Sequence, residues 1–149
     1  MPRVDLASLF MAVSFSANLF VGIYFRNMLP VAKEIGEGIL LLGFIMFGYV
    51  LLYLKKGFLG DTQPILDHLV RDGPYRFCRH PLYLSFITIL LGIDLMLGSL
   101  IACAFTFLLS IPSVVYRAKV EDELLRRKFG KQWEDYAKEV GFLLPRVLD

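Results

Sequence analysis

Two arginines and one of the two histidines lie close together, directly before a long apolar run that begins at Pro81. The stretch Arg76–Phe86 reads RFCRHPLYLSF, so His80 stands at the boundary between charged and apolar sequence. Histidine titrates near neutral pH, which makes His80 a candidate ligand contact or proton carrier; an interfacial histidine bonded to a carbonyl is an equal alternative. Arg79 and Tyr83 can donate hydrogen bonds to a polar ligand, and Pro81 suits the first turn of a helix.

A second polar stretch, YRAKVEDELLRRKFG, begins at Tyr116, directly after another apolar run. In a helix, Asp122 is four residues from Arg126 and Glu123 is four residues from Arg127. Both pairs are favourable at this spacing and predict a solvated helical face.

Glu121 differs from its two acidic neighbours. Four residues before it stands Arg117, but the residues three and four after it are Leu124 and Leu125. A carboxylate that faces apolar surroundings needs a cationic or hydrogen-bonding partner, which for Glu121 is Arg117 or an amine or hydroxyl group of a ligand. Arg117 and Glu121 are therefore the candidate catalytic pair.

The composition predicts that these polar stretches belong to a membrane protein. Of 149 residues, 56% are hydrophobic and 20% charged, and the mean hydropathy is +0.59. A bilayer core of about 30 Å needs roughly 20 helical residues. The chain therefore predicts an all-α integral membrane fold in one domain, 1–149, with about four spans at residues 6–25, 38–54, 81–97 and 100–116. The first span is expected to be retained, because no small-residue cleavage site follows it.

Spans three and four are predicted to form a tight hairpin. The apolar region from Pro81 to Tyr116 is too long for one span, and Gly98 and Ser99 can form the turn and cap the next helix. A hairpin brings its first and last residues together, so the Arg79–Tyr83 wall should lie beside Arg117 and Glu121. Asp94, close to the turn, is expected to have a capping or packing role, with a functional role as the alternative.

The positive charges predict an orientation. Fourteen of the 16 lysines and arginines fall at the N-terminus, in the loop after span two and in the tail. We therefore expect both termini and that loop in the cytoplasm, in the cell membrane if the protein is prokaryotic. In the loop after span two, the sequence predicts a short surface helix near 61–72. In the tail, 117–149, it predicts amphipathic helices on either side of Gly130. The helix after Gly130 has an apolar stripe of Trp133, Tyr136, Ala137 and Val140.

Two classes of function are disfavoured. The basic residues flank apolar segments and match no nucleic-acid-binding motif. Cys78 and Cys103 are too few and too far apart for a metal quartet, and we expect two free thiols and no metal.

Two stretches of the sequence, in this order and one hairpin apart, resemble the membrane methyltransferases of the isoprenylcysteine carboxyl methyltransferase and phospholipid N-methyltransferase group. They read GPYRFCRHPLY and EDELLRRKFGKQWEDYAKEVGFLLP. The resemblance covers Gly73–Pro145 and implies an S-adenosylmethionine site at the cytoplasmic face. It assigns cofactor binding to the following residues: Arg79, His80, Pro81, Tyr83, Glu121, Asp122, Leu144 and Pro145. The sequence departs from the family pattern at Asp122 (usually glutamate), Trp133 (usually tyrosine) and Ser85 (often glycine).

The resemblance implies a lipidic or prenylated acceptor that enters from the bilayer. Carboxyl O-methylation is slightly favoured, because a protonated amine must first lose a proton and no residue is an evident base. The oligomeric state is not predicted. Two alternatives stay open: an NADPH-dependent enzyme similar to membrane sterol reductases, and a small non-enzymatic membrane subunit.

Overall fold

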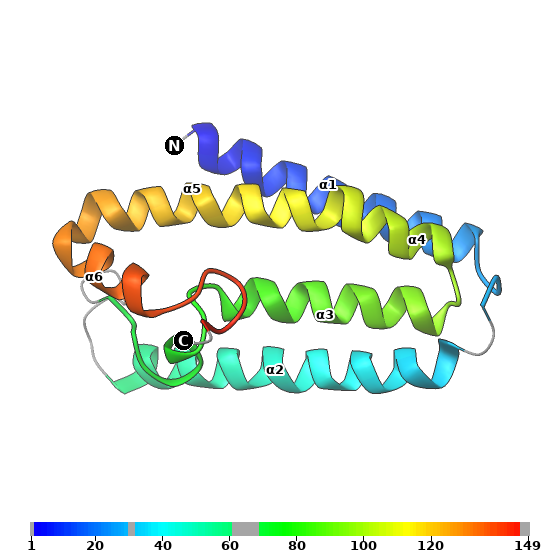
Figure 1. Ribbon diagram of the computed structural model, residues 1–149, viewed down its shortest axis with the longest axis horizontal. Helices are drawn as coiled ribbons and strands as arrows, with labels where there is room; N and C mark the ends of the chain where they lie inside the picture. Colours follow the sequence, from blue (N-terminus) through cyan, green and yellow to red (C-terminus); the bar gives the residue numbers. More distant parts are fainter. Residues whose placement is uncertain (1, 30–31, 61–68, 147–149) are drawn as a thin grey trace.

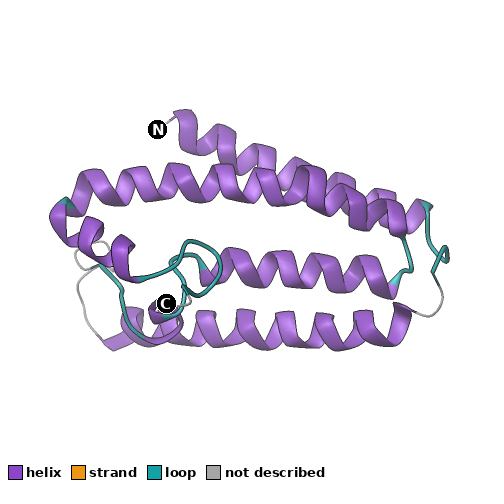
Figure 2. Ribbon diagram, in the orientation of Figure 1, coloured by secondary structure: helices purple, strands orange, loops and turns teal. Residues whose placement is uncertain are grey.

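The computed structural model describes residues 2–29, 32–60 and 69–146. Within these ranges the fold is all-α, with its helices antiparallel and loops at the two ends (Figures 1 and 2). The helices are α1 (Pro2–Tyr24), α2 (Lys33–Gly60), α3 (Pro81–Met96), α4 (Leu100–Phe105), α5 (Ile111–Phe129) and α6 (Lys131–Glu139). The surface helix expected near 61–72 falls mostly outside the described residues; Gly73–Arg76 forms a short 3₁₀ turn.

Three helical stretches are long and apolar enough to cross a membrane: Leu6–Tyr24, Lys33–Leu54 and Leu100–Phe129. The third predicted span, Pro81–Met96, is also helical and apolar but has only 16 residues. The membrane-spanning all-α fold is therefore confirmed, and the second span begins earlier than its apolar run suggests. This earlier start places Lys33 and Glu34 within the helix.

The hairpin turn between α3 and α4 forms where the sequence predicts it. Gly98 has a φ of +63°, a conformation that favours glycine, and the Ser99 hydroxyl accepts a hydrogen bond from the Ala102 N–H at 3.2 Å. From Leu100 the chain continues as one helical rod to Phe129 (Figure 1). The rod contains a π-helical turn, Thr106–Ser110, just before Pro112, whose ring nitrogen cannot donate a hydrogen bond to the preceding turn.

Asp94 packs in the interior and does not cap the turn with its side chain. It is fully buried, and its Oδ2 accepts hydrogen bonds from the Thr106 hydroxyl at 2.6 Å and from Asn18 Nδ2 at 3.4 Å. Asn18 Nδ2 also donates to Thr106 Oγ1. These three side chains come from α1, α3 and the π-helical turn, so the cluster joins three segments within the apolar interior. The packing role expected for Asp94 is the one observed.

Helices α2 and α3 approach so closely that glycines are required between them. A Cβ added to Gly43 would lie 2.7 Å from Ile89 Cγ1 and 2.8 Å from the Ile89 backbone nitrogen. A Cβ added to Gly92 would lie 2.5 Å from the Leu40 backbone nitrogen. Backbone atoms cannot move aside as side chains do, so these two positions set the distance between the helices.

This packing predicts different changes in stability when alanine replaces two glycines of α2. Gly43→Ala should lower the stability by about 1–3 kcal/mol, because the methyl group forces the helices apart. Gly48→Ala is the matched control: a Cβ there meets nothing within 4 Å, so its effect should be neutral or slightly stabilising. Thermal unfolding in detergent, followed by circular dichroism, measures both; equal effects would contradict the close approach.

Candidate active site

One carboxylate, Asp122, holds the start of α3 against α5. Its Oδ2 lies 3.1 Å from Arg79 Nη1, and its Oδ1 lies 2.9 Å from His80 Nε2. All three side chains are largely shielded from water. The pair predicted between Asp122 and Arg126 is therefore wrong: Arg126 contacts Glu134 instead, at 3.3 Å. The pair Glu123–Arg127 is confirmed at 2.9 Å.

The backbone before α3 explains how Arg79 and His80 reach α5. The Arg79 N–H donates to the Gly141 carbonyl at 2.9 Å, and Cys78 forms an isolated parallel bridge with the same residue. The chain after α6 thus lies along residues 78–79. Pro81 then begins α3, as predicted, and His80 is buried just before it with Phe142 edge-on to its ring. Both predicted free cysteines are confirmed as free thiols.

Glu121, one residue earlier on α5, is held by different partners. Its Oε2 accepts a hydrogen bond from the Tyr83 hydroxyl at 2.7 Å and lies 3.6 Å from Arg117 Nη1. Arg117 Nε in turn donates to Ser8 Oγ of α1 at 2.9 Å. The Glu121 side chain remains 39% exposed, whereas that of Asp122 is 13% exposed. Of the two adjacent acids, Glu121 is therefore the one available to a ligand.

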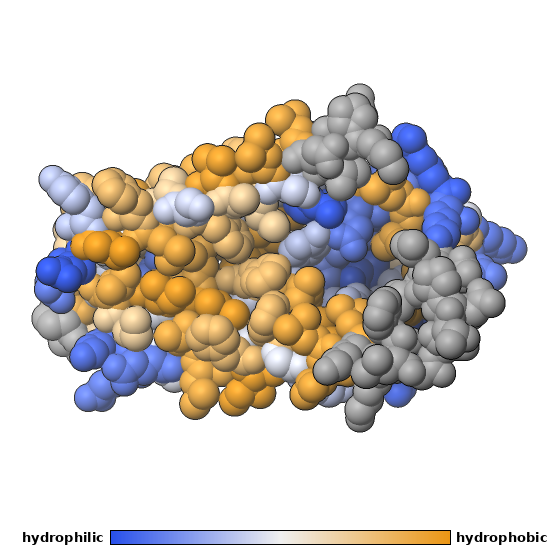
Figure 3. Space-filling view, turned by 180° about the vertical axis from the view of Figure 1, so that it is seen from behind, coloured by the Kyte–Doolittle hydropathy of each residue, from blue (hydrophilic) through white to orange (hydrophobic). Residues whose placement is uncertain are grey.

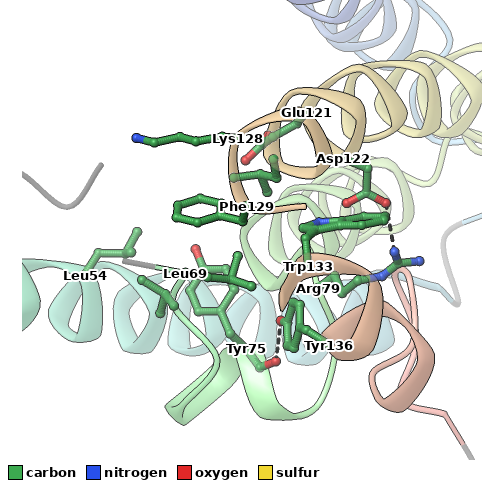
Figure 4. Close-up of a pocket in the computed structure, with 12 residues that line it drawn as sticks. Leu54, Leu69, Tyr75, Arg79, Glu121, Asp122, Lys128, Phe129, Trp133 and Tyr136 are labelled. Carbon is green, nitrogen blue, oxygen red and sulfur yellow. Dashed lines mark hydrogen bonds and ion pairs between the residues drawn. The ribbon is translucent and has the colours of Figure 1, made fainter. Parts of the chain in front are cut away.

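A cavity of about 250 Å³ opens between α5, α6 and the segment before α3. Figure 4 shows its aromatic side chains around a space that Glu121 and Lys128 border from α5. The lining combines apolar, aromatic and charged residues: Leu54, Leu69, Val70, Tyr75, Arg79, Glu121, Asp122, Leu125, Lys128, Phe129, Trp133 and Tyr136.

The predicted site residues fall into three groups. Arg79, Glu121 and Asp122 line the cavity. The residues behind its wall are His80, Pro81, Tyr83 and Arg117; His80, Tyr83 and Arg117 hold the lining carboxylates. Leu144 and Pro145 are exposed and do not line the cavity, so their cofactor role stays a prediction. The hairpin therefore brings the two polar stretches together as expected.

Four aromatic lining residues were not among the predicted site residues: Tyr75, Phe129, Trp133 and Tyr136. Tyr75 belongs to the GPY part of the motif, and Trp133 and Tyr136 share the predicted amphipathic stripe. The spacing of this stripe could have identified Trp133 and Tyr136 as lining residues, because both rings lie on the face of α6 turned to the cavity (Figure 4). The Tyr136 hydroxyl donates to the Tyr75 carbonyl at 2.7 Å and thus closes this wall.

Arginines hold two of these rings. The Arg79 guanidinium lies 5.4 Å from the ring centroid of Trp133 and 5.4 Å from that of Phe142. Arg71 lies 5.9 Å from the Tyr136 ring and donates to the Gln132 carbonyl at 2.7 Å. Such cation–π contacts favour one orientation of ring and guanidinium, so the wall is preorganised.

The ion pairs of neighbouring acids give a first site prediction. Asp122→Asn should lower stability by about 1–3 kcal/mol, because the largely buried Arg79 and His80 lose their charged acceptor. Glu123→Gln, which loses only the exposed pair with Arg127, should change stability by less than about 0.5 kcal/mol. Thermal unfolding in detergent compares the two; a loss of equal size would mean that Asp122 is only a surface charge.

Tyr75 gives a prediction for alkaline pH. Burial, and then the negative charge of Glu121, raise the pKa of Tyr75 from 10.0 to about 12. The fold therefore favours the neutral phenol: this stability is fully present below pH 10 and is lost as the pH rises through about 12. Thermal unfolding at increasing pH should show the wild type losing stability relative to Tyr75→Phe above pH 10. A constant difference between the two proteins would contradict the raised pKa.

Comparisons with known proteins identify a family for the chain. The family model described as phospholipid methyltransferase matches residues 34–132. A probable protein-S-isoprenylcysteine O-methyltransferase from Oryza sativa subsp. indica is 32% identical over 114 residues, 76% of this chain and 57% of the relative. The protein-S-isoprenylcysteine O-methyltransferase of Schizosaccharomyces pombe is 33% identical over 82 residues, 54% of this chain and 35% of the relative.

A relative that is named for metal resistance also matches. The nickel-cobalt-cadmium resistance protein NccN of Alcaligenes xylosoxydans xylosoxydans is 37% identical over 82 residues, 53% of this chain and 37% of the relative. The matched segments thus span between about a third and three fifths of these relatives. The family model covers the cavity-lining residues from Leu54 to Phe129, and on this match the chain belongs to the phospholipid methyltransferase family.

Proposed function

We propose that the chain transfers a methyl group from S-adenosylmethionine to a lipidic or prenylated acceptor. The observation that carries the proposal is the state of Glu121. Its carboxylate is fixed by Tyr83 and Arg117, yet it stays partly exposed in a cavity with aromatic and apolar walls. A carboxylate in such a place suits a ligand that is cationic and also has a flat apolar part.

The residues of the cavity fit S-adenosylmethionine. The ligand has a positive sulfonium and ammonium group, a carboxylate, a ribose diol and an adenine ring. Glu121 supplies the negative charge, and the rings of Tyr75, Phe129 and Trp133 supply surfaces for a planar group. Trp133 Nε1 and Arg79 Nε are buried and have no hydrogen-bond partner among the described residues.

When bound, S-adenosylmethionine supplies a methyl group on a sulfonium, which a nucleophile takes by in-line displacement. The protein contributes mainly position and electrostatics to such a reaction. Tyr83 and Arg117 hold Glu121 in one place, and Asp122 holds Arg79 and His80. Arg117 and Glu121, the predicted catalytic pair, are thus one turn apart on the same side of α5.

The acceptor is proposed to reach the site from the bilayer. Figure 3 shows hydrophilic side chains recessed beside a hydrophobic surface, at the end of the molecule that contains α6. An acceptor with an apolar chain can keep that chain in lipid while its polar end reaches the recess. Arg117 Nη1 is buried and lies 3.6 Å from Glu121 Oε2, so its charge is paired with that carboxylate. Carboxyl O-methylation is proposed over N-methylation, because a protonated amine must first lose a proton and no residue of the described site is an evident base.

The end that contains the cavity is proposed to face the cytoplasm. This end carries the basic tail and the loop before α3, whereas the opposite end, with Gly98, residues 25–29 and the start of α2, carries Arg26 and Lys33 as its described basic residues. The positive-inside rule then puts both termini in the cytoplasm. A water-soluble cofactor would enter from that side.

The alternatives predict other ligands. A sterol-reductase-like enzyme would bind NADPH, and a non-enzymatic subunit would bind neither cofactor. One relative has a metal-resistance name, and the described ranges contain no group of three or more His, Cys, Asp or Glu side chains that could hold a metal ion. Binding of NADPH to the purified protein, without binding of S-adenosylmethionine, would favour the reductase.

The proposal predicts the effect of neutralising Glu121. Glu121→Gln should lower kcat/KM by about 100-fold or more, because the charge that faces the reacting sulfonium is lost while the side chain keeps its shape. Glu123→Gln is the control on the same helix and should keep full activity. The assay incubates purified protein with methyl-labelled S-adenosylmethionine and either membrane lipids or prenylated peptides, and identifies the labelled product. No labelled lipid-phase product from the wild type would overturn the proposal.

A further inference from the structure

A polar cluster lies in the apolar interior, at the end of α3 that is away from the cavity. It consists of Asn18 of α1, Asp94 in the last turn of α3 and Thr106 of the π-helical turn, and all three residues are 0% exposed. The proposed reaction uses none of them. An ionisable residue inside a membrane-spanning helix is costly and is in most cases kept for a function, so this cluster is a candidate for a second site.

The cluster has one hydrogen too few for its oxygens. The Thr106 hydroxyl and the Asn18 amide group direct their polar hydrogens to Asp94 Oδ2 and Thr106 Oγ1. Two buried acceptors remain without a donor, Asp94 Oδ1 and Asn18 Oδ1. Turning the Asn18 amide would exchange its oxygen and nitrogen, but the number of hydrogens would stay the same. One further hydrogen, carried by one of these side chains and accepted by the other, would satisfy both.

The cluster also has no positive charge to neutralise an ionised Asp94. The described basic residues at this end of the molecule, Arg26 and Lys33, are exposed and form no ion pair with it. Among the described residues, the titratable side chain that interacts with Asp94 is the Cys103 thiol of α4, which brings no positive charge. An unpaired carboxylate in apolar surroundings is far more costly than a neutral carboxylic acid.

The free oxygen of Asp94 faces apolar groups. A Cβ added to Gly22 of α1 would lie 3.8 Å from Asp94 Oδ1, and the same Cβ would lie 3.2 Å from Leu97 Cδ1 and 3.6 Å from Ala102 Cβ. Gly22 is one helical turn after Asn18, so Oδ1 is directed toward the face of α1 that carries the amide. The surroundings of Oδ1 therefore offer no further polar partner besides Asn18.

Three kinds of occupant would change this balance, and they differ in what they supply. A water molecule would donate hydrogens to both oxygens but would leave the negative charge in place. A hard metal ion would neutralise the charge, but ions such as Ca²⁺ and Mg²⁺ take about six oxygen ligands, and the cluster leaves two side-chain oxygens free. A proton neutralises the charge and also supplies the one hydrogen that the two oxygens lack.

We propose that Asp94 and Asn18 form a proton-binding site in the membrane interior, in which Asp94 is a neutral carboxylic acid that donates its hydrogen to the Asn18 side-chain oxygen. One proton from water converts the carboxylate into the acid, and no other covalent bond changes. The acid joins α1, α3 and the π-helical turn without placing a net charge among apolar helices. The inference is independent of the proposed function, because the cluster lies outside the cavity.

Infrared spectroscopy tests the protonation directly. The C=O stretching band of a protonated carboxyl group is separate from the bands of ionised carboxylates, and the full chain is measured at neutral pH in a maltoside detergent, which has no carbonyl group. We expect a protonated-acid band that shifts when aspartate is ¹³C-labelled at its side-chain carboxyl and disappears in Asp94→Asn. Glu123→Gln, which alters an exposed acid, should leave the band unchanged. A labelled wild type without such a band would overturn the inference.

Two substitutions of Asp94 test the same state through stability. Asp94→Asn keeps a neutral group with a hydrogen to donate, and it should change the midpoint of thermal unfolding by less than about 2 °C. Asp94→Leu leaves Asn18 and Thr106 without their partner, and it should lower the midpoint by about 5 °C or more. A loss in Asp94→Asn as large as that in Asp94→Leu would show that the negative charge itself is required, which contradicts a neutral acid.

The salt composition separates a proton from a metal ion. Thermal unfolding of the wild type is measured in choline chloride, sodium chloride and calcium chloride at equal ionic strength. A proton-binding site predicts midpoints that agree within about 2 °C. Stabilisation by one of the metal salts that is lost in Asp94→Asn would identify a bound metal ion at this cluster and would overturn the inference.

Discussion

The site depends on one largely buried carboxylate, that of Asp122, which binds Arg79 and His80 together. Arg79 and His80 stand at the start of α3, and Asp122 lies in the middle of α5, so the contact closes the open end of the hairpin. A carboxylate shielded from water is costly unless it is paired, and breaking such a pair costs more than the pair contributes. The relative position of α3 and α5 is therefore constrained, and with it the position of Glu121 and the cavity.

The adjacent acids Asp122 and Glu121 thus have two different roles that both need a negative charge: one joins helices, and the other faces the cavity. Asp122 uses both oxygens for protein partners and cannot serve a ligand without releasing Arg79 or His80. Glu121 is bound through one oxygen by Tyr83 and Arg117, and it remains partly in contact with solvent. The aspartate in place of the usual glutamate is compatible with this division, because Arg79 and His80 come close enough for the shorter side chain.

The parts of this arrangement that follow from local sequence could be predicted. Gly98 and Ser99 mark the turn, apolar length marks the spans, and a hairpin necessarily joins its two polar ends. The partners of Asp122 could not be read from i,i+4 spacing, because Arg79 and His80 come from the start of α3. The π-helical turn Thr106–Ser110, which the sequence pattern does not reveal, precedes all three acids. One additional residue in a turn rotates everything after it by about 100°. Which of three consecutive acids faces α3 thus depends on a backbone feature that periodicity does not reveal. The buried donor of Trp133 likewise depends on tertiary packing.

Helix α1 contributes no side chain to the cavity, yet it positions the site. Three of its polar residues contact the rod from Leu100 to Phe129: Ser8 bonds Arg117, Ser14 bonds Ser110, and Asn18 bonds Thr106. Ser14 and Asn18 share one buried face of α1, and Asn18 also reaches Asp94 of α3. The contact between Asn18 and Thr106 holds α1 at the π-helical turn. The contact between Ser8 and Arg117 holds it one turn before Glu121. Because the rod is attached to α1 on both sides of Pro112, the rotation introduced by the π-helical turn is maintained, and Arg117 is kept within reach of Glu121. The polar residues of the first span therefore serve the site through the rod, which explains why a membrane helix outside the cavity carries hydrogen-bonding side chains on its buried face.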